Sequence, residues 1–202
     1  NSTFFNNTAD GQASGGAILA SGPLEVTDST FDSNQAGDHG GAIVSYAGAR
    51  ISNSTFVGNS AMTSAAVHLG EGGVISNSTF WNNGDADTFS IFAGGASPSY
   101  LFANILANDT PNTVKLIDPT QTTIDLGANL YTDSSIDDTT TGEGSSDLVD
   151  IDALELSDLA PANATSTETV AIGADSAAYD YYTADSQGIN PTASGEITSL
   201  LA

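Results

Sequence analysis

The first half of the chain carries a repeated pattern of apolar and polar residues. Its core is the motif Asx-Ser-Thr-Phe, followed three residues after the Phe by Asn. The apolar position of successive copies is held by Phe4, Phe31, Phe56, Phe80 and, in a weaker copy, Ile105. The copies recur about every 25 residues, which is typical of a solenoid built from stacked structural repeats.

Each repeat also contains a second apolar segment, which follows a pair of small residues. These pairs are Gly15-Gly16, Gly40-Gly41 and Ser64-Ala65, with a weaker version over residues 88–91. Short alternating segments rich in β-branched residues, separated by Gly, Asn, Asp and Ser, predict strands joined by turns. No stretch has the sustained 3.6-residue period of a helix.

We therefore predict an all-β fold, a right-handed parallel β-helix whose coils pair at a spacing of about 4.8 Å. One inward ladder should contain Phe4, Phe31, Phe56, Phe80 and Ile105. A second ladder should contain Ile18, Ile43, Val67 and Ile91. A turn ladder should contain Asn34, Asn59 and Asn83, since Asn tolerates left-handed backbone geometry. We expect Ser54 and Thr55 to lie outside the core, and the Gly-Gly pairs to form a corner by positive φ or close backbone approach.

The regular coils should occupy residues 1–110, and residues 111–202 should form irregular coils and loops. The second part keeps short apolar segments, over residues 116–119, 124–126, 148–154 and 169–172. We expect these to continue or cap the solenoid. The chain opens inside a repeat and lacks an initiator Met, so we expect a segment of a larger precursor.

Composition narrows the classes of partner. The chain has 25 Asp and Glu against 2 Lys and Arg, and its formal net charge is −23. Such a field repels phosphate backbones and anionic lipids, so nucleic acid is not an expected partner. The sequence has no apolar run of about 20 residues, so this segment should not be embedded in a membrane. It also lacks Cys, which excludes a disulfide framework.

Two motifs together resemble a known family. The Phe-x-x-Asn and Gly-Gly-Ala-Ile motifs, as in residues 31–34 and 40–43, are similar to the repeats of chlamydial polymorphic outer-membrane autotransporters. The whole chain also resembles secreted bacterial β-helix proteins of the choice-of-anchor Q group. That second resemblance is carried by Leu126-Gly-Ala-Asn-Leu130, Gly173-Ala-Asp-Ser-Ala-Ala-Tyr-Asp180 and Asp185-Ser-Gln-Gly188. Both resemblances imply a right-handed β-helix on a cell surface or in an extracellular matrix, and the first group consists of adhesins.

β-Helices also host carbohydrate-cleaving enzymes. Lyase chemistry commonly needs a base and cations beside the substrate carboxylate, but Arg50 and Lys115 are the only Arg and Lys and lie far apart in the repeat array. Inverting hydrolysis needs carboxylates about 6.5–9.5 Å apart. The candidates are Asp28, Asp32 and Asp38, whose equivalents one repeat later are Asn53, Gly58 and Thr63. Because no carboxylate patch continues along the stack, we predict no catalytic residue and no enzymatic activity.

The histidines and the acidic loops are the remaining candidate ligands. His39 precedes a Gly-Gly pair and His68 lies in a strand segment, so we expect that they do not stack as a ligand pair. Calcium is favoured over catalysis, because Asp-rich loops supply hard oxygen ligands. The calcium candidates are Asp133, Asp137, Asp138, Asp147, Asp150 and Asp152. Neither an EF-hand loop nor a Gly-Gly-x-Gly-x-Asp repeat is present, and diffuse cation screening is the alternative.

The sequence as a whole indicates a structural or adhesive segment of a secreted or cell-surface bacterial protein. We expect a rigid acidic surface, contact with cell-surface glycans or matrix, and self-association end to end, which would generate filaments. The alternative is a carbohydrate-binding or carbohydrate-active β-helix. A groove with clustered carboxylates and an exposed Tyr or Trp would favour that alternative.

Overall fold

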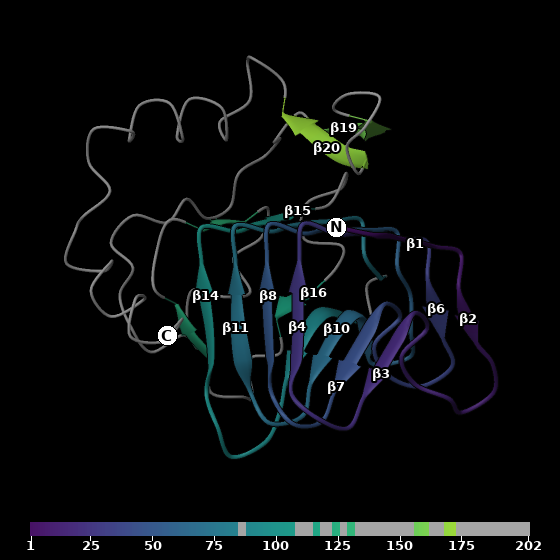
Figure 1. Ribbon diagram of the computed structural model, residues 1–202, viewed down its shortest axis with the longest axis vertical. Helices are drawn as coiled ribbons and strands as arrows, with labels where there is room; N and C mark the ends of the chain where they lie inside the picture. Colours follow the sequence, from purple (N-terminus) through teal and green to yellow (C-terminus); the bar gives the residue numbers. More distant parts are fainter. Residues whose placement is uncertain are drawn as a thin grey trace.

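The computed structural model describes residues 1–84, 88–107, 115–117, 123–125, 129–131, 156–161 and 168–172. These residues form short β-strands joined by turns, and they contain no helix. Three parallel sheets run along a common stack, and from β1 to β18 consecutive strands of the chain belong to different sheets. Figure 1 shows β4, β8, β11 and β14 side by side, with β3, β7 and β10 in a neighbouring layer. The parallel β-helix predicted from the sequence is confirmed, while its right-handed sense stays a prediction.

The first sheet contains the Ser-Thr-Phe repeats. Its six strands are, in order, β1 (Thr3–Phe5), β5 (Thr30–Asp32), β9 (Thr55–Val57), β12 (Thr79–Trp81), β15 (Ile105–Ala107) and β18 (Leu130–Tyr131). Phe4 pairs with Phe31, Phe31 with Phe56, and Phe56 with Phe80. Their rings stack at centroid distances of 4.7, 4.9 and 4.6 Å. Phe31, Phe56 and Phe80 are fully buried, so this ladder is the centre of the core.

The fifth member of this ladder is Leu106, and the expectation of Ile105 is wrong. Phe80 pairs with Leu106, whereas Ile105 pairs with Thr79. The register is fixed by Asn104, whose Oδ1 accepts a hydrogen bond from the backbone N–H of Ser78 (3.0 Å). This contact places Asn104 one coil beyond Ser78, so the next residue aligns with Thr79. Both Ile105 and Leu106 are buried.

The strands of the other two sheets come after the glycine pairs, or their equivalents, in each repeat. The second sheet contains β3 (Ile18–Ala20), β7 (Ile43–Ser45), β10 (Ser64–Leu69), β13 (Phe89–Ala93) and β16 (Lys115–Ile117). The third contains β4 (Leu24–Thr27), β8 (Ala49–Ser52), β11 (Gly73–Ser76), β14 (Ser99–Phe102) and β17 (Thr123–Asp125). The inward column of the second sheet is Ile18, Ile43, Val67 and Ile91. The third sheet contributes the inward residues Val26, Ile51, Ile75 and Leu101.

Two shorter pairings complete the described strands. β2 (Thr8–Ala9) pairs in parallel with β6 (Gln35–Ala36). β19 (Leu156–Pro161) and β20 (Glu168–Ile172) pair antiparallel. The apolar segment at residues 169–172 therefore lies in an antiparallel pair, unlike the parallel strands of the coils.

The Asn of each Phe-x-x-Asn motif occupies a buried corner. The backbone N–H and Nδ2 of Asn34 both donate to Oδ1 of Asn59 (3.0 Å each). Asn59 donates in the same way to Asn83, and its Nδ2 also donates to the carbonyl of Phe31 (3.0 Å). Asn7 forms the same contacts with Asn34. Each carboxamide thus satisfies buried backbone groups of the preceding coil, as buried polar groups require.

A second polar ladder lies before the Phe strands and contains Ser29, Ser54, Ser78, Asn104 and Asn129. Each accepts a hydrogen bond from the backbone N–H of the preceding coil, as Ser54 does from Ser29 (3.3 Å). The hydroxyl of Ser54 donates to the carbonyl of Ser52 (2.9 Å). The expectation that Ser54 and Thr55 lie outside the core is wrong, because only 2% and 7% of their surfaces are exposed.

The two glycines of each Gly-Gly pair have different roles. Gly15 and Gly40 have φ values of +72° and +59°, which L residues with a Cβ rarely adopt. Gly16 and Gly41 allow close approach, since a Cβ on Gly41 would lie 2.2 Å from the carbonyl oxygen of Ala65. The corner therefore requires both glycines, one for conformation and one for space.

Candidate functional site

The outward side chains of the solenoid differ from coil to coil. In the third sheet the outward column is Glu25, Arg50, Val74 and Tyr100. In the second sheet it is Leu19, Val44, His68 and Phe92. These columns mix acidic, basic, aliphatic and aromatic residues, whereas the inward columns that contain Ile43 and Ile51 are aliphatic in every described coil. Two features of these outer faces are candidate sites.

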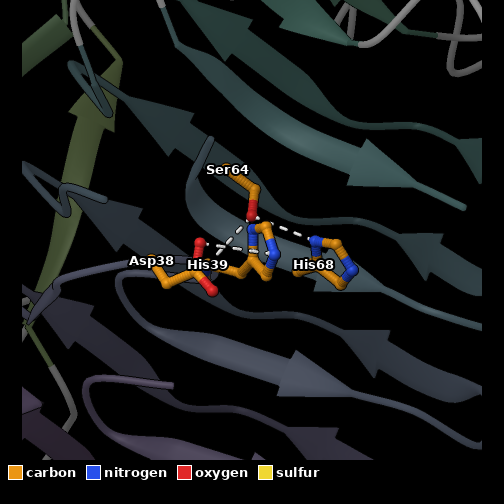
Figure 2. A network of polar contacts seen from close by, with 5 residues as sticks. Asp38, His39, Ser64 and His68 are labelled. Carbon is orange, nitrogen blue, oxygen red and sulfur yellow. Dashed lines mark hydrogen bonds and ion pairs between the residues drawn. The ribbon is translucent and has the colours of Figure 1, made fainter. Parts of the chain in front are cut away.

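The first feature is a cluster of Asp38, His39, Ser64 and His68, drawn in Figure 2. The imidazole rings of His39 and His68 stack with centroids 4.7 Å apart and planes inclined by 27°. The expectation that these histidines do not stack is therefore wrong. His39 belongs to the loop before β7, which folds across the outer face and places its ring beside the strand residue of the next coil. Sequence position within the repeat does not reveal this fold of the loop.

His68 is enclosed on several sides. Phe92 stacks on its ring at 4.7 Å, and Tyr46 meets it edge-on at 6.4 Å. Its Nδ1 lies 3.3 Å from Oγ of Ser64, which also accepts a hydrogen bond from the Gly40 N–H (2.9 Å). The pKa of His68 is lowered to about 4, chiefly by burial and also by the neighbouring His39, while Asp38 opposes the shift. His68 is therefore neutral at physiological pH, which suits a Ser64 hydroxyl that donates to Nδ1.

This arrangement does not match a catalytic triad. Asp38 lies 3.4 Å from Nε2 of His39, so the carboxylate contacts the histidine that is not beside the serine. Ser64 is fully buried and cannot reach a substrate. The cluster instead covers the outer face: Val44 points outward yet is fully buried, and a Cβ on Gly40 would meet its Cγ2 at 2.5 Å. We interpret the cluster as packing that seals this face.

The candidate carboxylates of a hydrolase occupy different parts of the coil. Asp28 is exposed at a corner with φ of 51°, Asp32 lies in β5, and Asp38 lies in the loop before β7. Asp32 pairs with Val57, which corrects the expected equivalent Gly58. Within the described residues no group of three or more His, Cys, Asp or Glu side chains has the arrangement of a metal site. The six calcium candidates between Asp133 and Asp152 lie outside the described residues.

The second feature is a groove of about 530 Å³ on the outer face of the third sheet. Four successive coils line it, through the turns that precede β4, β8, β11 and β14 and the first residues of these strands. Its polar and aromatic lining comes from Glu25, Arg50, Glu71 and Tyr100. Sequence reasoning missed this groove, although its signal is the aligned set of turn residues Pro23, Gly48, Gly72 and Pro98.

Arg50 is the cationic group of this groove. It is exposed, and its guanidinium has no hydrogen bond or ion pair within the part of the chain that the structure describes, although its register partner in β4 is Glu25. The other basic residue, Lys115, lies in β16 of the second sheet. The two basic residues thus belong to different sheets. The arrangement leaves a guanidinium available to a ligand beside two carboxylates and a tyrosine.

Comparison with known proteins gives one finding. Residues 1–21 and 28–46 match the Chlamydia polymorphic membrane protein repeat. These residues hold the first two Phe-x-x-Asn motifs and the two Gly-Gly-Ala-Ile motifs, and they cover less than half of the chain. No curated protein and no solved structure matches the chain. The first two repeats are thus similar to that repeat, and the likeness to the choice-of-anchor Q group rests on the sequence resemblance alone.

The described residues include no helix that is long and apolar enough to cross a membrane.

Proposed function

We propose that this chain is a non-catalytic, adhesive β-helix segment of a bacterial cell-surface protein. The observation that carries the proposal is the contrast between the two sides of its strands. In the second and third sheets, the inward columns that contain Ile43 and Ile51 repeat aliphatic side chains, whereas the outward columns change chemical class along the stack. A scaffold with a uniform interior and a varied exterior is suited to the recognition of a partner by several different contacts.

The match of two repeats to the Chlamydia polymorphic membrane protein repeat supports a location at the cell surface. The net charge of −23 supports a surface that attracts cations and stays soluble in salt. Cell-surface glycans or matrix are the proposed contacts. End-to-end self-association belongs to the same proposal, and light scattering at increasing protein concentration would detect it as a rising mass.

Carbohydrate binding deserves weight as the alternative because the groove carries two carboxylates and Tyr100. Carboxylates accept hydrogen bonds from hydroxyl groups, and an aromatic ring packs on the apolar face of a sugar. Binding of this kind is compatible with adhesion. Cleavage is a separate activity and is not part of the proposal.

The adhesive function is tested with beads that carry the full 202-residue chain. The beads are placed on cell monolayers and on immobilised matrix proteins, and their retention is measured under flow. We expect retention that soluble chain competes away and that exceeds the retention of beads carrying an unrelated protein of similar net charge. Equal retention of both kinds of bead would overturn the adhesive function. Release of shortened oligosaccharides, measured by mass spectrometry, would overturn its non-catalytic character.

A further inference from the structure

The groove on the third sheet is hollow because its turns lack side chains where four coils meet. Gly48 and Gly72 occupy its middle, between Pro23 and Pro98 at equivalent positions of the flanking coils. Gly72 has a φ of +77°, and a Cβ there would lie 2.5 Å from the carbonyl oxygen of Pro98. Gly72 thus allows two coils to approach closely, whereas a Cβ on Gly48 would meet no atom closer than 3.7 Å, so the missing side chain of Gly48 leaves space in the groove. Three strand spacings of about 4.8 Å give it a length of about 14 Å along the stack.

The lining of the groove combines three kinds of group. Glu25 and Glu71 are exposed and present hydrogen-bond acceptors. Arg50 is exposed and presents donors that no described residue uses. Tyr100 is half-buried, so its ring is held in place while part of it faces the groove. Such a set of acceptors, donors and an aromatic surface matches a molecule rich in hydroxyl groups with apolar C–H faces.

We propose that this groove binds an uncharged oligosaccharide that lies along the axis of the solenoid. The proposal rests on the adhesive function and names its ligand. Hydroxyl groups of the sugar donate to Glu25 and Glu71, Arg50 donates to sugar oxygens, and one sugar ring packs on Tyr100. Anionic glycans are excluded by the two carboxylates and by the net charge of −23. An acidic peptide is disfavoured on the same grounds.

The test uses the full chain and a set of immobilised oligosaccharides. The set contains neutral glucose, mannose and N-acetylglucosamine oligomers, together with sialylated and sulfated glycans. We expect binding to at least one neutral oligomer and none to the anionic glycans. Tyr100→Ala should weaken that binding roughly tenfold or more, as the loss of an anchor residue does. Ala47→Trp, at an exposed position of the lining, should fill the groove and abolish binding.

Two matched variants lie outside the groove. Tyr46→Ala removes an exposed tyrosine from a neighbouring turn, and Asp32→Asn neutralises a carboxylate of the first sheet. Both should keep the affinity of the unaltered chain, and all variants should keep its circular dichroism spectrum and a cooperative melting transition to show that they fold. The proposal would be overturned if the chain bound only anionic glycans or bound no neutral oligomer. It would also be overturned if Tyr100→Ala bound the neutral oligomer with the same affinity as the unaltered chain. If beads that carry Tyr100→Ala or Ala47→Trp adhere as well as beads that carry the unaltered chain, the adhesive function is retained and the groove is not its ligand site.

Discussion

The inward and outward columns of the third sheet lie on the same strands, yet they follow different rules. Val26, Ile51, Ile75 and Leu101 are all branched aliphatic residues, whereas Glu25, Arg50, Val74 and Tyr100 share no chemical property. Inside, each side chain must pack against its equivalents in the coils above and below, and close packing penalises a change in volume or polarity. On the outer face the side chains contact water, which does not restrict their chemical class in the same way. The constraint of stacking therefore acts on one face only.

The largest effect should follow from a break in the phenylalanine ladder. Phe56 is fully buried between the rings of Phe31 and Phe80. Phe56→Ala should lower the free energy of unfolding by about 3–5 kcal/mol, and Phe56→Asp by more, because a carboxylate would be buried. Urea denaturation measures the loss. Val57→Ala, one residue away and half-buried, should cost about 1 kcal/mol or less, and a similar loss at both positions would contradict the distinction between the faces.

The asparagine corner should come next. Asn59→Ala would leave the buried N–H of Asn34 and the carbonyl of Phe31 without these partners, at a cost of about 3 kcal/mol. The comparison residue is Asn53, which is exposed at another corner with φ of 49°. Asn53→Ala should cost about 1 kcal/mol through backbone strain alone. If denaturation showed equal losses, the carboxamide ladder would have no special share in stability.

A pH effect tests His68, a titratable residue that points outward but is buried. The pKa of His68 is about 4, below the ordinary value of 6.5, so the unfolded chain binds a proton more readily than the folded chain. The contribution of neutral His68 to the free energy of unfolding is fully present above pH 6.5 and is lost as the pH falls toward 4. Between pH 7 and pH 5 we expect a loss of about 2 kcal/mol from this group.

The control for this effect is His68→Phe, which copies the residue of the next coil at Phe92. Denaturation of this variant should depend less on pH over the same interval. Unchanged pH dependence would show that His68 titrates normally and that the loop of Asp38 and His39 does not seal it.

Smaller losses are expected at the serine corner. Ser54→Ala removes the acceptor for the Ser29 N–H and a donor to Ser52, which should cost about 1 kcal/mol. Ser21, an exposed serine in a turn, is the matched position, and Ser21→Ala should change the stability by less than about 0.5 kcal/mol. Identical urea midpoints for the two variants would argue against a structural role of the serine ladder.

The smallest effect should occur in the groove. Arg50→Ala removes an exposed side chain without a partner among the described residues, so the free energy of unfolding should change by less than about 0.5 kcal/mol. The matched inward change at the adjacent residue, Ile51→Ala, should cost about 2–5 kcal/mol. A large loss from Arg50→Ala would mean that the outer face also supports the fold.

The sequence predicts most of the interior, because inward residues recur at a fixed period. Phe31, Phe56 and Asn59 lie where that period places them. The period places Ile105 in the phenylalanine ladder, which is wrong. Asn104 replaces a serine there, and the hydrogen bond between Asn104 and Ser78 sets the register. The sealed histidine cluster depends on the path of a loop, which has no periodic signal. The groove depends on glycines that leave space, and a missing side chain produces no pattern of hydrophobicity.

The direction of the asparagine contacts has a consequence for biosynthesis. The carboxamide of Asn59 serves backbone groups of the coil before it, at Asn34 and Phe31, and that of Asn34 does the same for Asn7 and Phe4. A coil that has just left the ribosome thus has a corner that only the following coil can complete. Each coil should become fully protected from hydrogen exchange only after about 25 further residues have emerged. Folding of the solenoid would therefore lag behind its synthesis by one coil.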